Sequence, residues 1–371
     1  MRSLAPRRWQ NAALVAACLA AFAFARAPRV VADTLPNQYT DREFWNLTSD
    51  FSEESGYFQS DNLLSNEMGY QTVIPELLRR IKPGGVYLGV GPEQNFTYIA
   101  ALKPKLVFIT DIRRGNLHTQ LMYKALFELS ADRADFVSRL FSKPRPAGLT
   151  TKATADDLVN KYYVDTSEAL YNANVKAIED VLTKKHGFPL SATDLTGIEY
   201  VYGQFYWWGP RINYSSSAQT QGGRGGGSMA TYADLMMQDD GAGVNRGFLG
   251  SEETFQFMKD LESRNMVVPF VGDFAGPKAL RGEAKYLKDH QATVVAFYLS
   301  NVEQYLTQNG VWGSFCKNVA ALPLDDSSTF IYSANGGGGG RGGGLGSQIR
   351  PMLAEVKQYC PTGAAAPGPI K

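Results

Sequence analysis

The chain has 371 residues, of which 44% are hydrophobic and 20% charged, a composition that excludes a mainly disordered protein. Its length fits either two domains or one α/β domain with a large insertion. The 37 basic and 36 acidic side chains leave a formal charge of +1, with no basic run longer than a pair, which argues against nucleic acid as a partner.

Residues 1–32 have the pattern of a secretory signal peptide. They contain no acid and place arginines before an apolar run from Ala12 to Ala25. The run, about 14 residues long, is shorter than the roughly 20 that span a bilayer. We therefore expect export to the periplasm or the exterior, cleavage between Arg26 and Asp33, and no transmembrane segment in the mature protein.

Two other interpretations of residues 1–32 are less favoured, namely a lipoprotein signal with lipid anchoring through Cys18 and a mitochondrial presequence. Cleavage would leave Cys316 and Cys360, an even pair compatible with an oxidising compartment. A bond between them would stabilise the fold by roughly 4 kcal/mol through lost chain entropy. Two separate buried thiols fit the sequence equally well.

The spacing of apolar residues predicts the helices and strands of the chain before Ala131. Residues 33–61 show weak periodicity, and a helix is expected over Asn62–Ile81. Strand, helix, strand and helix should follow at Val86–Gly91, Glu93–Leu102, Lys105–Asp111 and Asn116–Leu129. This alternation indicates a parallel sheet.

The alternation lapses between Ala131 and Gly250, which predicts an insertion between the second and third strands. It contains helix candidates near Ala155–Tyr163 and Ser167–His186, an aromatic cluster at Tyr200–Tyr214, and a glycine-rich loop at Gly222–Gly227. The aromatic rings would either stack on a ligand or cover the sheet edge.

After the insertion the alternation resumes. Strands are expected at Val267–Gly272, Ala292–Ser300 and Thr329–Ser333. Helices are expected at Glu252–Arg264, Pro277–His290, Val302–Asn309, Phe315–Ala320 and Gln348–Tyr359. The chain would then consist of a signal peptide (1–32), two core parts (33–130 and 251–371) and an insertion (131–250).

The residues that close each strand are the candidates for a binding site, because open parallel sheets bind ligands beyond the carboxyl ends of their strands. After the first strand, Gly89 and Gly91 permit a tight turn and close approach of a ligand. Asp111 closes the second strand, where a carboxylate can accept hydrogen bonds from ribose hydroxyls. Asp273 follows the third strand and Asn301 the fourth.

This order of motifs resembles class I methyltransferases that use S-adenosylmethionine, over Val86–Leu129 and Val267–Ser333. More narrowly, GVYLGVGPEQNFTYIAALKPKLVFITDIRRGN and VVPFVGDFAGP look like an uncharacterised bacterial family with a methyltransferase-like core. The resemblance implies a Rossmann-like α/β fold, with a mostly parallel sheet and helices on both faces.

The resemblance also implies roles for the strand-end residues. Gly89 and Gly91 would line the methionine and ribose of S-adenosylmethionine, and Asp111 would hold the ribose hydroxyls. Asp273 would meet the adenine amino group, and Asn301 would lie near the methyl-transfer centre.

The chain departs from the methyltransferase pattern at two positions. Tyr87 replaces the acid usually found before the first glycine, and Glu93 occupies the position of the third glycine. A carboxylate at Glu93 would either repel a cofactor carboxylate or anchor its amino group. The structural alternatives are a turn without a ligand, and acids that cap helices or pair with Arg113 or Arg114.

Two functions follow. The favoured one is an exported protein that binds a ligand or partner in the cleft without methyl transfer, because S-adenosylmethionine is made in the cytosol. The alternative is a methyltransferase acting on an O or N nucleophile. No catalytic residue is assigned, the histidines lack metal-ligand spacing, so no metal is expected, and the oligomeric state stays open.

Overall fold

A computed structural model gives the structure of residues 33–214, 216, 229–335 and 345–360. The chain divides between Asp33 and Thr34, and the elements below belong to the unit that begins at Thr34. Within these ranges, no helix combines the length and apolar character needed to cross a membrane. The predicted signal peptide and the glycine-rich loop at Gly222–Gly227 lie outside the described residues.

A six-stranded sheet of order β3-β2-β1-β4-β5-β6 forms the centre. Its strands are β1 (Val86–Gly89), β2 (Leu106–Asp111), β3 (Val267–Val271), β4 (Val294–Ser300), β5 (Thr329–Asn335) and β6 (Leu345–Pro351). All neighbours are parallel except β5 and β6. The strands β1 to β4 are almost wholly buried, which explains their continuous apolar sequences. The predicted mostly parallel, Rossmann-like α/β fold is confirmed.

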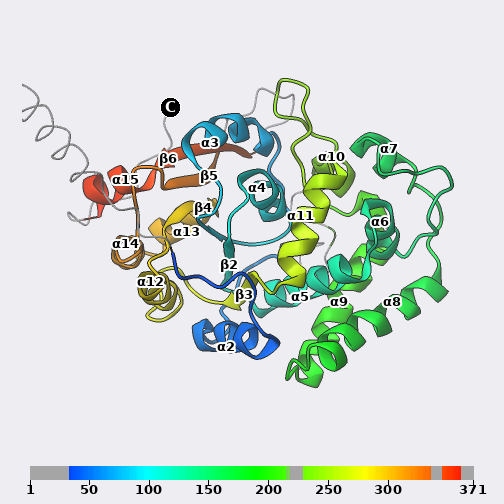
Figure 1. Cartoon of the computed structure of the whole chain (residues 1–371), viewed down its shortest axis with the longest axis horizontal. Helices are drawn as coiled ribbons and strands as arrows, with labels where there is room; N and C mark the ends of the chain where they lie inside the picture. Colours follow the sequence, from blue (N-terminus) through cyan, green and yellow to red (C-terminus); the bar gives the residue numbers. More distant parts are fainter. Residues whose placement is uncertain (1–32, 215, 217–228, 336–344, 361–371) are drawn as a thin grey trace, which may run out of the picture. The chain divides into compact units, whose positions relative to one another are not determined.

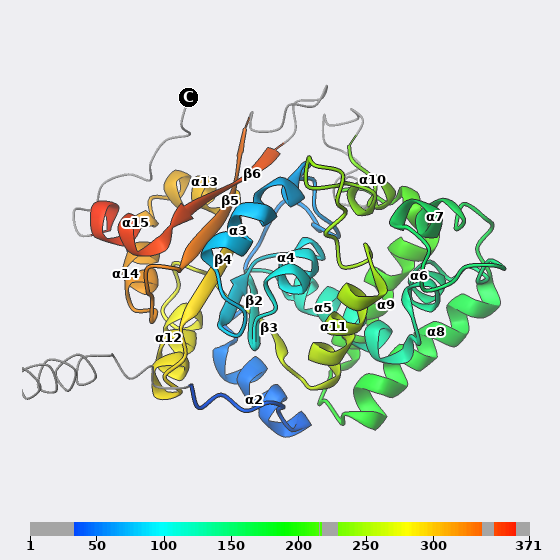
Figure 2. The same cartoon turned by 45° about the horizontal axis from the view of Figure 1, so that its top comes forward.

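Helices cover both faces of the sheet. Figures 1 and 2 show α3 (Ile74–Arg80), α4 (Gln94–Leu102) and α11 (Glu252–Ser263) on one side, and α12 (Ala279–Asp289) and α14 (Trp312–Ala320) on the other. The chain runs from β1 through β2 to β3, then returns across the sheet to β4. Because crossovers are right-handed, this reversal places later helices on the opposite face and leaves a crevice between β1 and β4.

A group of helices lies between β2 and β3, after α5 (Arg114–Leu129). It comprises α6 (Arg133–Phe141), α7 (Ala155–Asn160), α8 (Glu168–Asp180), a π-helix (Val181–Lys185), α9 (Ala192–Trp208), a 3₁₀ turn (Gly209–Arg211) and α10 (Tyr232–Met236). In both views these helices gather beyond α5 and α11, away from the strands. Buried rings of α9 pack on α5 and α8, as Phe205 does on Tyr123 and Tyr202 on Tyr171.

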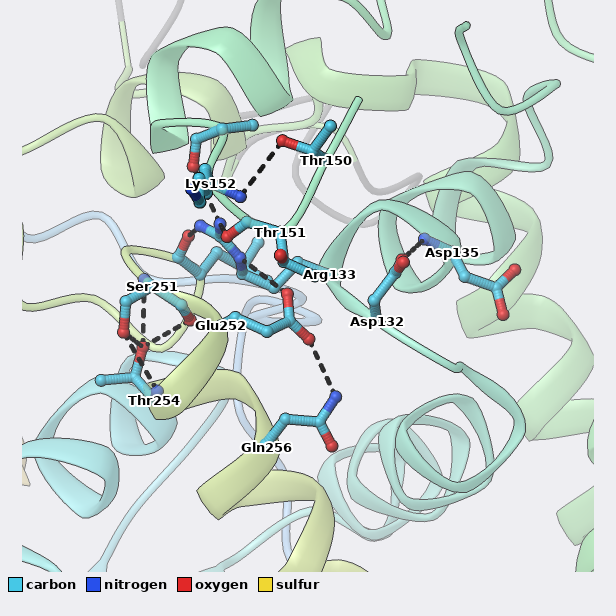
Figure 3. Close-up of polar contacts among 12 residues, drawn as sticks. Asp132, Arg133, Asp135, Thr150, Thr151, Lys152, Ser251, Glu252, Thr254 and Gln256 are labelled. Atoms are coloured by element: carbon cyan, nitrogen blue, oxygen red, sulfur yellow. Dashed lines mark hydrogen bonds and ion pairs between the residues drawn. The ribbon is translucent and has the colours of Figure 1, made fainter. Parts of the chain in front are cut away.

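Arg133, at the start of α6, joins this helix group to the core (Figure 3). Its guanidinium is buried, and Nε donates to Oε2 of Glu252 on α11 at 3.2 Å. Nη1 donates to the Leu249 carbonyl at 2.7 Å, and Nη2 to the carbonyls of Thr151 and Ala153 at 2.9 and 2.8 Å. We call Arg133 and these four partners the Arg133 cluster.

Two differences from the predicted elements lie before β1. The segment of weak periodicity contains α2 (Asp41–Phe51), which begins with a capping box formed by Thr40 and Glu43. The helix predicted over Asn62–Ile81 is wrong in its first half, where only a 3₁₀ turn (Tyr70–Val73) precedes α3. Gly69, with a φ of 72°, sets the turn apart from the extended chain before it.

A third difference lies near the C-terminus. The helix predicted from Gln348 begins only at Met352, as α15 (Met352–Tyr359). The residues before it belong to β6, where main-chain hydrogen bonds to β5 outweigh the local helical pattern.

A disulfide joins Cys316 of α14 to Cys360 at the end of α15, with the two Cα atoms 5.0 Å apart. It decides between the two alternatives that the cysteine count left open. The bond closes a loop of 44 positions and holds α15 against α14.

Candidate functional site

A cavity of about 320 Å³ lies at the carboxyl ends of β1 to β4, where the strand order reverses. Its volume is that of a small-molecule pocket. Four of the six predicted site residues line it: Gly91, Asp111, Asp273 and Asn301. Each follows or ends a different strand, so the reversal of the sheet brings together residues up to 210 positions apart.

Gly89 is not among the lining residues and has a packing role instead. A Cβ at this position would clash with Oδ1 of Asn95 on α4. The Asn95 amide donates to the carbonyls of Val90 and Pro92 at 2.9 and 2.7 Å, and its oxygen accepts from the Tyr87 hydroxyl at 2.9 Å. Asn95 therefore shapes the turn after β1, and Tyr87 supports it from within the sheet.

Glu93 also lies outside the cavity lining. It is completely buried, and Oε1 accepts from the Ser65 amide at 3.3 Å, while Oε2 has no partner among the described residues. Burial raises the pKa of this carboxyl to about 8, so it is largely protonated at pH 7.

Asp111 is 5% exposed and faces the cavity from the end of β2. Its Oδ1 accepts from the Arg113 amide at 2.9 Å and lies 3.3 Å from Nε of the same residue. The predicted alternative of an ion pair with Arg113 is thus present, whereas Arg114 binds Asp194 of α9 at 2.6 and 3.0 Å. Oδ2 of Asp111 has no hydrogen-bond partner in the described chain.

Arg113 also lines the cavity, where the sequence offered it only as an ion-pair partner of the strand-end acids. Its Nη1 donates to the Asp61 carbonyl, and its guanidinium carbon lies 6.0 Å from the centre of the Phe58 ring. The side chain is 90% buried, and Nη2 has no partner among the described residues. An unpaired buried donor of this kind typically costs about 1–3 kcal/mol.

The loop after β3 is held by its own side chains and by Glu53. Asp273 Oδ1 accepts from the Ala275 amide at 2.8 Å. Glu53 Oε1 accepts from the amides of Lys278 and Ala279, both at 2.8 Å, at the start of α12. A carboxylate of the protein therefore occupies the helix end that could otherwise receive a ligand phosphate.

One wall of the cavity is the extended chain between α2 and the first 3₁₀ turn, residues 52–67. The Glu53 amide donates to the Val271 carbonyl and the Gly56 amide to the Ile112 carbonyl, both at 2.8 Å, which fixes this wall across the ends of β3 and β2. Asp61 in the wall accepts from the Tyr200 hydroxyl of α9 at 2.7 Å. These contacts hold residues 52–67 in place as a wall of the cavity.

Polar side chains behind the cavity converge on Glu67, which is 1% exposed. Its Oε1 accepts from the hydroxyls of Tyr298 and Ser300 at 2.8 and 2.5 Å. Its Oε2 accepts from the Gln94 amide at 2.9 Å and the Ser347 hydroxyl at 3.3 Å. We call these five residues the floor cluster, because Tyr298 and Ser300 line the cavity.

Two residues other than glycine with left-handed backbone line the cavity. Among the described residues, six other than glycine have φ in the left-handed region, and four of them lie just after helices: Lys103, Ser142, Asn265 and Gln291. The other two, Asn62 (φ 47°) and Ser300 (φ 50°), both line the cavity. Such residues cluster at ligand and active sites, where the surrounding structure holds them.

A family model described as a domain of unknown function (DUF7790) matches residues 63–338. The match includes β1 to β5 and all six predicted site residues, whereas the wall before Leu63 precedes it. No curated protein matches the chain. Within the described residues, no three His, Cys, Asp or Glu side chains are arranged to hold a metal ion.

Proposed function

We propose that this chain, which belongs to the DUF7790 family, binds a small nucleoside-like molecule in the cleft and transfers no methyl group. The supporting observation is that Gly91, Asp111, Asp273 and Asn301 line one cavity. Ribose and base are covalently linked, so the two acids can serve one nucleoside only if both reach the same space. Their shared cavity meets this requirement.

The contacts of Asp111 and Arg113 suggest how a ribose would be held. Oδ2 of Asp111 is open to accept from a hydroxyl, and Nη2 of Arg113 is a donor without a partner. A hydroxyl group both donates and accepts, so it can use the two side chains together. Gly91 has no side chain to obstruct the ligand, and Asp273 would accept from an amino group of the base.

Methyl transfer from S-adenosylmethionine is the second candidate, favoured by the same four residues on the same strand ends. Tyr87 and Glu93 set the chain apart from that pattern, and both are buried away from the cavity. The expected export would also separate the protein from the cytosolic supply of the cofactor. We therefore place ligand binding first.

Calorimetric titration with adenosine, S-adenosylmethionine and S-adenosylhomocysteine tests the proposal. We expect binding that weakens about 10- to 150-fold in Asp111→Ala, because hydrogen bonds to a charged group are typically worth about 1.5–3 kcal/mol. The matched control is Asp260→Ala, an exposed acid of α11 that pairs with Arg264. Binding should be unchanged there.

The outcomes separate the two candidates. No binding of any of the three compounds, or unchanged affinity in a folded Asp111→Ala protein, would overturn the nucleoside site. Formation of S-adenosylhomocysteine from S-adenosylmethionine with an acceptor, lost in Asp111→Ala, would establish methyl transfer instead.

We also propose that the protein is exported. The arginine-rich, acid-free start of the chain and the bond between Cys316 and Cys360 support this, because disulfides persist in oxidising compartments. N-terminal sequencing of protein from its native cell should find the mature end between Arg26 and Asp33. Recovery from the cytosol with Met1 intact would contradict export.

A further inference from the structure

The hydroxyl protons of the floor cluster are directed away from the cavity. Tyr298 and Ser300 both line it, and both donate to Oε1 of Glu67 at 2.8 and 2.5 Å. A carboxylate can only accept, so the direction of these two bonds is fixed. Ser65, a third lining residue, likewise donates its hydroxyl proton to Oε1 of Gln94.

The oxygens left facing the cavity can therefore only accept. A hydroxyl has one proton and two lone pairs, and in Tyr298 and Ser300 the proton is already used. A ligand group that meets this part of the cavity must donate hydrogen bonds. A carboxylate, a phosphate or an ether oxygen of the ligand would face lone pairs and be repelled.

The charges around the floor cluster favour a cation over a neutral donor. Within the described chain, the hydrogen bonds to Glu67 come from neutral hydroxyl and amide groups. Asp111 and Asp273 line the cavity, Glu67 lies behind it, and Arg113 is the single cation among the described lining residues. Three carboxylates against one guanidinium leave a negative excess, which a positively charged ligand group would offset.

We infer that the ligand of the cleft carries a primary amine, which binds as an ammonium group to the Tyr298 and Ser300 hydroxyls with Glu67 behind them. This inference rests on the proposed nucleoside site and adds the chemistry of the ligand's other end. The left-handed backbone of Ser300 (φ 50°) fits this role, because it holds the hydroxyl on Glu67 at the cavity surface.

Matched pairs of compounds test the inference by calorimetry at pH 7. The first pair is 5′-amino-5′-deoxyadenosine and adenosine, which differ only in carrying an amine or a hydroxyl at the 5′ carbon. The second is 5′-deoxy-5′-(3-aminopropylthio)adenosine and 5′-deoxy-5′-(butylthio)adenosine, which places the amine farther from the ribose and replaces it with a methyl group in the partner. We expect the amine to bind at least about tenfold tighter than its partner in one pair, a gain within the range of charged hydrogen bonds.

Variants assign that gain to the floor cluster. Tyr298→Phe keeps the ring and removes the hydroxyl, and Ser300→Ala removes the second acceptor. Either should reduce the amine preference to less than about threefold. Tyr305→Phe is the control, since Tyr305 lines the same cavity without a hydrogen bond to Glu67 among those of the described chain.

The results distinguish the two proposals. Adenosine binding without an amine preference in either pair, or a preference that survives in both folded variants, would overturn the ammonium site alone. If none of the four compounds binds, the nucleoside site fails and the ammonium site fails with it.

Discussion

The Arg133 cluster and the cleft both hold a buried arginine where several elements meet, yet they satisfy it differently. Every nitrogen of the Arg133 guanidinium has an acceptor, one carboxylate and three carbonyls (Figure 3). In the cleft, Arg113 uses Nε and Nη1 but leaves Nη2 without a partner in the described chain. A fully paired buried cation locks a junction, whereas an incompletely paired one beside a cavity is ready for a ligand.

The carboxyl groups near the two arginines differ in the same way. Glu252 meets Arg133 as an ion pair. Around the cleft, Glu93 contacts the wall through Ser65, and Glu283 accepts from Thr110, a lining residue, at 2.8 Å. Neither carboxyl has a cation partner among the described residues. Burial raises the pKa of both to about 8. Two buried carboxyls around the cleft are therefore largely protonated at pH 7.

The largest predicted effect comes from removing Arg133. In Arg133→Met the free energy of unfolding should fall by about 3–5 kcal/mol, because Glu252 and three carbonyls lose a buried donor. Urea unfolding measures this change. Arg145→Met is the control: its pair with Asp132 is 40% exposed on the arginine side and should be worth less than about 1 kcal/mol. Equal losses of unfolding free energy in the two variants would contradict the structural role of the buried Arg133.

The second prediction concerns the disulfide. Cys316→Ala with Cys360→Ala should lower the free energy of unfolding by about 2–4 kcal/mol. Asn318, also on α14, donates to the carbonyls of Phe274 and Gly276 at 2.9 and 2.8 Å, in the loop that carries Asp273. We therefore expect weaker nucleoside binding as well, measured by calorimetry. Stability lost with full affinity would show that α14 supports the fold but not the cleft.

The fold could be predicted from the sequence because its strands are buried on both faces. That burial makes runs such as Val267–Val271 continuously apolar, and the residues ending them follow from strand order. β6 escaped prediction because its residues carry a helical pattern, which main-chain hydrogen bonds to β5 outweigh. The start of α2 carried a readable signal, the capping box of Thr40 and Glu43, which weak periodicity obscured.

Only part of the candidate site could be predicted from the sequence. The strand pattern identified Asp111 and Asp273, because both lie at strand ends, and both line the cavity. Glu67 and Tyr298 are 231 positions apart, so no local pattern joins them. Nor could the sequence show that Gly89 packs on Asn95, because a glycine at the end of a strand is compatible both with a bound ligand and with a neighbouring side chain.

The third prediction uses the raised pKa of Glu93. Folded Glu93 has a pKa of about 8 against an ordinary 4.5, so between these values the folded state holds a proton that the unfolded state has released. The contribution of protonated Glu93 to the free energy of unfolding is therefore complete below pH 4.5. It declines between pH 4.5 and pH 8, by at most about 1.4 kcal/mol per pH unit.

Urea unfolding between pH 5 and 8 tests whether the free energy of unfolding falls with rising pH, as predicted. The amide in Glu93→Gln cannot ionise, so that variant should lose stability less steeply with rising pH than the parent. Glu253→Gln is the control, because hydrogen bonding to Lys103 lowers the pKa of Glu253, which is therefore ionised throughout the window. A parent and a Glu93→Gln variant with identical slopes would contradict a protonated Glu93.

The smallest predicted effect on stability separates strain in the cleft from strain elsewhere. Asn62→Gly should change the free energy of unfolding by less than about 1 kcal/mol, because glycine adopts its φ of 47° without penalty. Nucleoside affinity should fall, since the amide lining the cavity is lost.

Asn265 is the matched control: it is also left-handed, but its amide donates to the Tyr39 carbonyl at 3.1 Å and to Asp41 at 2.9 Å. Asn265→Gly should cost about 1–3 kcal/mol and leave affinity intact. Asn62→Gly could instead lower the free energy of unfolding as much as Asn265→Gly does and leave nucleoside affinity unchanged. Asn62 would then be a structural residue like Arg133, and its left-handed backbone would not indicate a binding role.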